Sequence, residues 1–258
     1  MKNKSLLLLL TFCLCSVLIA QNQQPKWLNI VYIGNSITQG VQIEEPKRNA
    51  PPVKASVYLH KQEDVGEVKF SNQGVSGSTT VDFLPQNNIL FPKVKEAADL
   101  LKEDTWATLI FSIMLGTNDS AVKGPNGSPV SPEQYKENLK TIINELLIGY
   151  PASIVVLHQP LWYSPTTYNS SIYLQEGLDR LQTYFPEIRS LVTEYKDQYP
   201  DQVFLGDTEG FDFFREHKEE FLILEEGNQG VFYLHPNKEG AAKLGELWGK
   251  AIHRIINE

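Results

Sequence analysis

The sequence predicts an α/β protein, a three-layer α/β/α sandwich built around a five-stranded parallel sheet. Short apolar, β-branched runs alternate along the chain with longer amphipathic ones, a pattern typical of strand–helix–strand units. The first of these runs, residues 28–33, does not alternate in polarity, as expected of a strand covered on both faces. With 258 residues, 41% hydrophobic and 21% charged, the chain is able to bury a full core. We expect one domain over residues 21–258.

Residues 1–20 have the pattern of a secretory signal peptide, with basic Lys2 and Lys4 followed by a short apolar run. That run is too short for a membrane span, and no second one follows, so we expect no stable membrane insertion. Both cysteines, Cys13 and Cys15, lie within it. The mature chain is therefore expected to be exported, to the periplasm or outside the cell, without disulfides or thiolate chemistry.

The formal net charge of −8 argues against nucleic acid as a partner, because phosphates require a basic surface. The five histidines show no spacing typical of zinc ligation. We therefore expect neither a metal nor an organic cofactor.

The first half of the chain supplies three of the five strands. The apolar run 28–33 ends at Gly34, and Pro51-Pro52 opens a helix over 53–61, because proline fits a first helical turn. A second strand, 65–72, ends in a loop of glycines and small hydroxyl residues. A helical pattern over 81–101 is interrupted near Pro85 and Pro92, before the apolar strand 106–113.

The second half repeats the pattern. Ser131, followed by Pro132 and by Gln134 three positions later, marks the start of a helix that runs to about Ile148. A helical pattern over 171–199 is expected to break at Pro186. The other expected elements are strands over 153–158 and 203–205 and helices over 213–222 and 236–256.

Ser36 is the candidate nucleophile. It follows the first strand after Gly34-Asn35, residues that permit the tight backbone of a sharp strand exit. Open α/β sheets build their ligand sites at the carboxyl ends of their strands. The alternative is that Ser36 only caps the next segment, since serine is a favoured N-cap.

Two further loops belong to the same edge, because all strands of a parallel sheet end there. These loops are Gly74–Gly77 and Gly116–Asp119, and His235 precedes the terminal helix at a position from which it can reach them. Taken singly, Gly77 and Asn118 fit ordinary turns and a lone histidine fits an exposed surface.

Taken together, the segments 34–37, 74–77, 116–119 and 235–237 resemble, in order and spacing, the conserved blocks of the SGNH (GDSL) hydrolase family. Asn35 stands where the commonest first block has Asp. Residues 49–52 and the His-Pro-Asn turn look like the branch that contains secreted carbohydrate acetylesterases. The resemblance implies a flavodoxin-like fold and an ester substrate, either a small molecule or a glycan.

The resemblance also implies roles for four residues. Ser36 would attack the ester carbonyl while His235 acts as general base and then as acid to the leaving alcohol. The oxyanion would be held by the backbone N–H groups of Ser36 and Gly77 and by the side-chain amide of Asn118.

The pattern breaks at Phe232, where the family has an Asp three residues before the histidine. That carboxylate normally holds the imidazole in its productive tautomer. Three explanations stay open: another carboxylate replaces it, a backbone carbonyl orients His235, or the site binds without turnover. The nearest candidate carboxylates in sequence are Glu225, Glu226, Asp207 and Asp212.

Three more residues lie at the same edge of the sheet: His158 ends the strand 153–158, and Trp162 and Tyr163 lie in the loop that follows it. His158 is a rival base, although a loop histidine without a role is the simpler interpretation. Trp162 and Tyr163 fit sugar stacking, and they equally fit a core that covers the end of the sheet.

The sequence therefore favours an exported esterase that removes acetyl or other short acyl groups from a carbohydrate. The alternatives are a lipase or lysophospholipase of the same family, a catalytically impaired glycan-binding relative motivated by Phe232, and a purely structural scaffold, for which Ser36→Ala would change nothing.

Overall fold

The computed structural model describes residues 24–258. The strands are β1 Lys26–Gly34, β2 Val65–Gly74, β3 Thr108–Met114, β4 Ile154–Leu157, β5 Val203–Leu205, β6 Leu222–Gly227 and β7 Gly230–Pro236. The helices are α1 Ser36–Gln39, α2 Pro46–Asn49, α3 Pro51–His60, α4 Phe91–Leu101, α5 Pro132–Gly149, α6 Leu174–Gln198, α7 Gly210–Glu216, α8 Lys218–Phe221 and α9 Lys238–Ile255, with 3₁₀ turns η1 Val81–Phe83 and η2 Pro85–Asn87.

The predicted five-stranded parallel sheet is confirmed, with strand order β2-β1-β3-β4-β5 and parallel pairing throughout. Strand β1 is buried from Leu28 to Gly34, which explains why its sequence does not alternate in polarity. Its last residue, Gly34, lies opposite Gly74 of β2 and Met114 of β3. The three strands therefore end at the same level, and the loops that follow them begin side by side.

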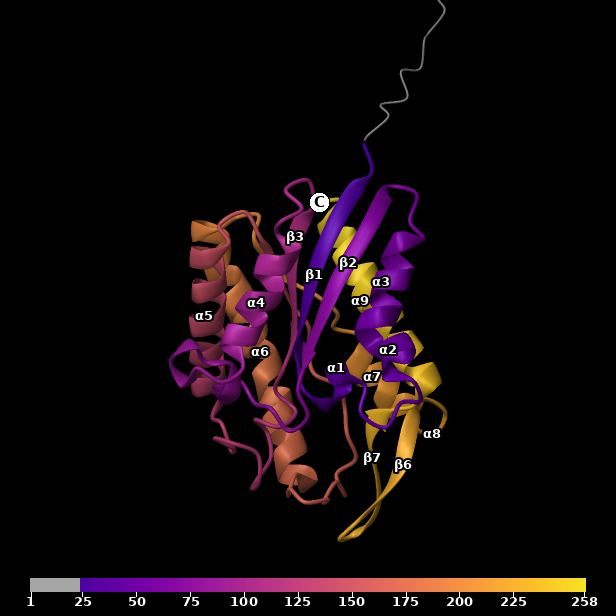
Figure 1. Cartoon of the computed structure of the whole chain (residues 1–258). Helices are drawn as coiled ribbons and strands as arrows, with labels where there is room; N and C mark the ends of the chain where they lie inside the picture. Colours follow the sequence, from indigo (N-terminus) through magenta and orange to yellow (C-terminus); the bar gives the residue numbers. More distant parts are fainter. Residues whose placement is uncertain (1–23) are drawn as a thin grey trace, which may run out of the picture.

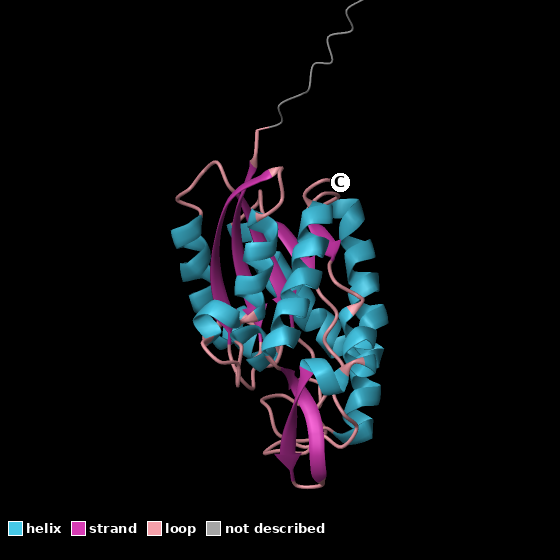
Figure 2. Ribbon diagram, turned by 90° about the vertical axis from the view of Figure 1, so that its right-hand side faces the viewer, coloured by secondary structure: helices cyan, strands magenta, loops and turns pink. Residues whose placement is uncertain are grey.

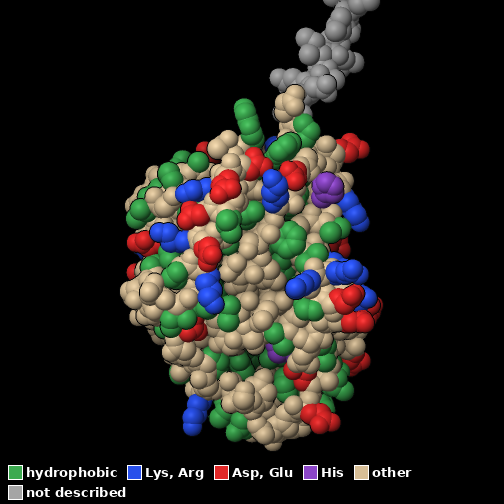
Figure 3. Space-filling model, in the orientation of Figure 1, with side chains coloured by type: hydrophobic (Ala, Val, Ile, Leu, Met, Phe, Trp, Pro, Cys, Tyr) green, Lys and Arg blue, Asp and Glu red, His purple; other side chains and the backbone are tan. Residues whose placement is uncertain are grey.

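Helices cover both faces of the sheet (Figure 1), with α4, α5 and α6 on one side and α3 and α9 on the other. Trp248 of α9 is 1% exposed and stacks on Tyr32 of β1, with ring centroids 6.0 Å apart. Seen from the face in Figure 3, basic and acidic side chains are interspersed over the surface.

A two-stranded antiparallel hairpin, β6–β7, stands apart from the main sheet and projects beyond its carboxyl edge (Figure 2). Sequence analysis did not predict these strands. Segment 164–169 holds the hairpin on one side, since Ser164 N donates to the Tyr233 carbonyl at 2.9 Å and Asn228 N donates to the Tyr168 carbonyl at 2.7 Å.

The predicted break at Pro186 is wrong, because α6 runs continuously from Leu174 to Gln198. The helix is buried on both sides of the proline, at Leu181 and Tyr184 before it and at Ile188 after it. Their packing outweighs the one backbone hydrogen bond that proline removes.

Two other helix predictions hold only in part. The stretch 81–101 contains two 3₁₀ turns before α4, and 213–222 contains the second half of α7 and all of α8.

The predicted signal peptide at residues 1–20, with Cys13 and Cys15, lies outside the described residues. Within residues 24–258, no helix is long and apolar enough to cross a membrane.

Candidate active site

Ser36 lies at the carboxyl edge of the sheet, one residue beyond Asn35, which caps the short helix α1. The Asn35 side chain accepts a hydrogen bond from Ile37 N at 3.0 Å, and so holds the turn that presents the serine. Gly34 has no room for a side chain, because a Cβ there would lie 2.8 Å from the Met114 carbonyl oxygen. Ser36 itself is 9% exposed.

His235 reaches Ser36 from the far end of the chain. It lies near the end of β7, and its Nε2 is 2.9 Å from Ser36 Oγ. The structure thus brings together two residues separated by 199 positions in the sequence.

Glu225 completes the arrangement from β6. Its Oε1 lies 2.9 Å from His235 Nδ1 and also accepts the backbone N–H of His235 at 3.2 Å. In the hairpin ladder Glu225 is paired directly with Phe232. Glu225 therefore contacts the imidazole from the strand opposite Phe232, the position at which the resembled family has its Asp.

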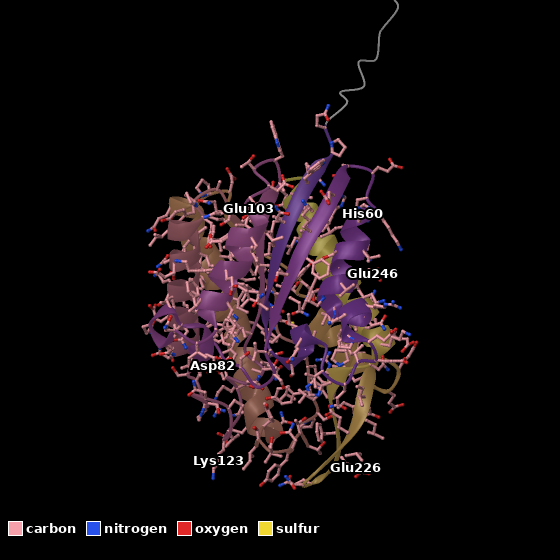
Figure 4. All side chains as sticks on the ribbon, viewed as in Figure 1. His60, Asp82, Glu103, Lys123, Glu226 and Glu246 are labelled. Carbon is pink, nitrogen blue, oxygen red and sulfur yellow. The ribbon has the colours of Figure 1, made fainter. Side chains whose placement is uncertain are left out.

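The other three candidate carboxylates lie elsewhere. Glu226 is exposed on the other face of the hairpin, where Figure 4 shows it near the hairpin's projecting end. Asp207 accepts hydrogen bonds from the backbone N–H groups of Glu209 and Gly210, and Asp212 pairs with Arg215 at 2.8 Å.

The carboxyl group of Glu225 is held in its ionised form. Burial raises its pKa, but the hydrogen bonds and the charge interaction with His235, together with the hydrogen bond from Gln42, lower it by more, so the pKa lies below its usual value. An ionised carboxylate only accepts hydrogen bonds, so His235 Nδ1 carries the imidazole proton. Nε2 is then left with a lone pair that faces the Ser36 hydroxyl.

Asn118 is buried in the loop after β3, with both ends of its amide engaged. Its Nδ2 donates to the Ser78 carbonyl at 2.8 Å, and its Oδ1 accepts the Tyr173 hydroxyl at 2.7 Å. Burial raises the pKa of Tyr173 to about 12, so the hydroxyl keeps its proton and acts as the donor. The amide is thereby fixed in one orientation, with one Nδ2 hydrogen unused.

The loop that carries Gly77 is tied to its neighbours by the residues that follow it. Ser78 Oγ donates to the Val75 carbonyl at 2.8 Å, and Asp119 Oδ1 accepts Thr80 N at 2.9 Å. Gly77 itself has φ +79°, a left-handed conformation that favours glycine. Neither its N–H nor that of Ser36 donates to an acceptor within residues 24–258.

His158 and the two aromatics after β4 belong to the core. His158 is 1% exposed, and burial lowers its pKa to about 3, so the ring is neutral at physiological pH. Its Nδ1 accepts Asp207 N at 2.9 Å, and its Nε2 lies 3.0 Å from Ser112 Oγ. Trp162 and Tyr163 are buried at 7% and 0% exposure, which fits the core interpretation rather than sugar stacking.

Gln42 and Tyr173 are contacts of the site that sequence analysis missed. Neither belongs to a motif. The hairpin that brings Glu225 to the site did carry a signal, the β-branched and aromatic run 231–234 preceded by the turn residues 227–230. Among the described side chains, no group of three or more His, Cys, Asp and Glu is placed to hold a metal ion.

Comparison with known proteins gives a family and a set of structural neighbours. The GDSL-like lipase/acylhydrolase family matches residues 32–243. A comparison with curated protein sequences gives no significant match.

Among solved structures, the chain is similar to a carbohydrate acetylesterase from Sinorhizobium meliloti (16% identity, TM-score 0.58, covering 88% of this chain and 99% of the other). It is also similar to an acetylxylan esterase from Geobacillus stearothermophilus (17%, TM-score 0.57, 92% and 97%). An aryl esterase from M. smegmatis gives 17% identity and a TM-score of 0.58 over 88% and 99% of the two chains.

Proposed function

The chain belongs to the GDSL-like lipase/acylhydrolase family and is a carboxylic ester hydrolase, and we propose that it removes acetyl or other short acyl groups from a carbohydrate. The proposed mechanism rests on one chain of contacts. His235 Nε2 lies 2.9 Å from Ser36 Oγ, and His235 Nδ1 lies 2.9 Å from Glu225 Oε1. This is the geometry of a serine nucleophile, its general base and the group that orients the base.

In the proposed reaction, Ser36 Oγ attacks the ester carbonyl carbon as its proton passes to His235 Nε2. The tetrahedral intermediate collapses with cleavage of the bond between the acyl carbon and the sugar oxygen, and His235 gives its proton to that oxygen, which leaves as a sugar hydroxyl. Water then attacks the acyl group on Ser36 and gives a proton to His235. His235 passes this proton to Ser36 Oγ as the second tetrahedral intermediate collapses, which releases the free acid and restores the serine hydroxyl. Glu225 stabilises the imidazolium that forms in both halves of the cycle.

The oxyanion that develops in each half requires donors fixed in advance. We assign this role to the N–H groups of Ser36 and Gly77 and to Asn118 Nδ2. The unused amide hydrogen of Asn118 supports the assignment, as do the two backbone N–H groups, which have no acceptor among residues 24–258.

The carbohydrate substrate is proposed on two grounds. Two of the similar solved structures are described as a carbohydrate acetylesterase and an acetylxylan esterase. Residues 1–20 also have the pattern of a leader for export, which fits an enzyme that meets glycans outside the cytoplasm. We propose that the remainder, 21–258, is the exported single domain, and N-terminal sequencing of the mature protein tests this boundary.

The deciding experiment compares hydrolysis of p-nitrophenyl acetate, butyrate and octanoate, together with acetate release from acetylated xylan. We expect kcat/KM to be highest for acetate and to fall about 10⁴-fold or more in Ser36→Ala and His235→Ala. Ser190→Ala, an exposed serine on α6, is the matched control and keeps wild-type activity.

Other outcomes point to the other functions. A rate that rises with acyl chain length supports a lipase or lysophospholipase. Binding of acetylated xylan without turnover of any ester supports a glycan-binding relative. That alternative was motivated by the missing carboxylate at Phe232, and the contact of Glu225 with His235 weakens this motive.

A further inference from the structure

Gln42 adopts a backbone conformation that is unusual for its residue type. It lies in the loop between α1 and α2, is exposed, and has φ +66°, in the left-handed region that glycine favours. Residues other than glycine keep such a conformation only where the surroundings hold them, and they cluster at functional sites.

The side chain of Gln42 reaches across to the hairpin. Its Nε2 donates to Glu225 Oε2 at 2.6 Å and lies 3.3 Å from His235 Nδ1. Both nitrogens are donors, so the 3.3 Å separation is not a hydrogen bond between them. The two nitrogens lie close together because both donate to the Glu225 carboxylate: His235 Nδ1–H donates to Oε1, and the Gln42 amide donates to Oε2.

This second anchor matters because Glu225 stands on an element separate from the sheet that carries Ser36. A glutamate side chain rotates freely about its last torsion, and a rotated carboxylate no longer presents Oε1 to the imidazole. Gln42 follows Ser36 by only six residues. The segment that presents the nucleophile therefore also holds the carboxylate of the hairpin.

We infer that Gln42 is a positioning residue for the ester hydrolysis, holding Oε2 of Glu225 so that Oε1 stays on His235 Nδ1. The left-handed backbone is the conformation that delivers its amide to the carboxylate. The inference rests on the proposed function and deepens it, since Gln42 acts through Glu225 and His235.

Gln42→Met removes the donor while keeping the length of the side chain. We expect kcat to fall about 10-fold, the size of one hydrogen bond to a charged group, with KM unchanged. If Gln42 contacted the substrate instead, KM would rise and kcat would hold, and the inference would be overturned.

Gln42→Gly separates positioning from structural support. Glycine relieves the φ +66° conformation, so Tm should equal or exceed that of the wild type while kcat falls as in Gln42→Met. A residue with a merely structural role would lose Tm and kcat together. Glu45→Gly is the matched control, because Glu45 also has positive φ (+48°) and makes no side-chain contact with the site, so its kcat should stay at the wild-type level.

Gln42→Glu adds a pH readout. The introduced carboxyl has nearly the shape of the amide but donates to Glu225 only when protonated. The titratable groups that face Glu225 are His235 on β7 and Tyr173 just before α6, and both are shared with the wild type. The ratio of variant to wild-type kcat should therefore rise as pH falls, and a ratio that is flat with pH would count against the inference.

Ser36→Ala, measured alongside on p-nitrophenyl acetate, separates a failure of the proposed function from a failure of the inference about Gln42. If it keeps full activity, the proposed function fails and the inference fails with it. If it is inactive while Gln42→Met keeps wild-type kcat, only the inference fails. Loss of activity in Ser36→Ala with a selective kcat loss in Gln42→Met and Gln42→Gly supports both.

Discussion

Replacement of Glu225 by glutamine tests how much the hairpin contributes to the reaction. Glutamine keeps the volume of the side chain and removes its charge, so His235 Nδ1–H faces at best a neutral carbonyl. At the 2.9 Å separation and an effective dielectric constant of about 20, Coulomb's law gives about 6 kcal/mol between carboxylate and imidazolium. Each 1.36 kcal/mol is tenfold in rate, so this upper value corresponds to about 10⁴ in kcat.

We expect a fall in kcat of about 10³ to 10⁴ for Glu225→Gln, measured on p-nitrophenyl acetate at saturating substrate. Glu226→Gln is the matched control, because it changes the charge by the same amount on the exposed face of the same strand. A kcat of Glu225→Gln within tenfold of the wild-type value would contradict a role of the Glu225 charge in the reaction. It would show that His235 is oriented by the backbone and that Ser36 and His235 work as a dyad.

Three further predictions concern the loops around the nucleophile. Tyr173→Phe removes the donor that fixes the Asn118 amide and should lower kcat about 5- to 10-fold, a loss that disappears when Asn118 is already alanine. Gly77→Ala puts a side chain into open space but at φ +79°, so urea unfolding should show a loss of about 1–2 kcal/mol, and an unchanged midpoint would contradict the assigned conformation. Burial raises the pKa of Asp119 to about 6, so this group favours folding below its unfolded pKa of about 3.9 and loses that contribution as pH rises through 6. Asp119→Asn should therefore gain stability relative to the wild type between pH 4 and pH 7, by up to about 3 kcal/mol, and a difference that does not change with pH would contradict the assignment.

The convergence of Ser36, Gly77 and Asn118 was predictable because it depends on topology. The carboxyl ends of parallel strands share an edge of the sheet. Because Gly34 pairs with Gly74 and with Met114, the loops that carry the three residues begin at the same level. Local sequence was sufficient for this, since glycines and small polar residues mark each strand exit.

The partner of His235 was not predictable to the same degree, because it depends on the register of a hairpin. Side chains alternate between the faces of a strand, so a slip of one residue in β6 would exchange Glu225 and Glu226. Register is set by the turn at Gly227–Gly230 and by burial of Phe232, which is 1% exposed. The contact of Gln42 with Glu225 was less predictable still, because it requires a left-handed backbone conformation that glutamine rarely adopts.

Covalent labelling tests whether Ser36 is the nucleophile of the ester hydrolysis. An organophosphate or sulfonyl fluoride that reacts with activated serines is mixed with the protein, and the adduct is located by intact mass and peptide mapping. We expect one adduct per chain, on Ser36, with labelling slowed at least about 10³-fold in His235→Ala. Ester hydrolysis that continues while Ser36 stays unlabelled, or an adduct on another residue, would contradict this role of Ser36.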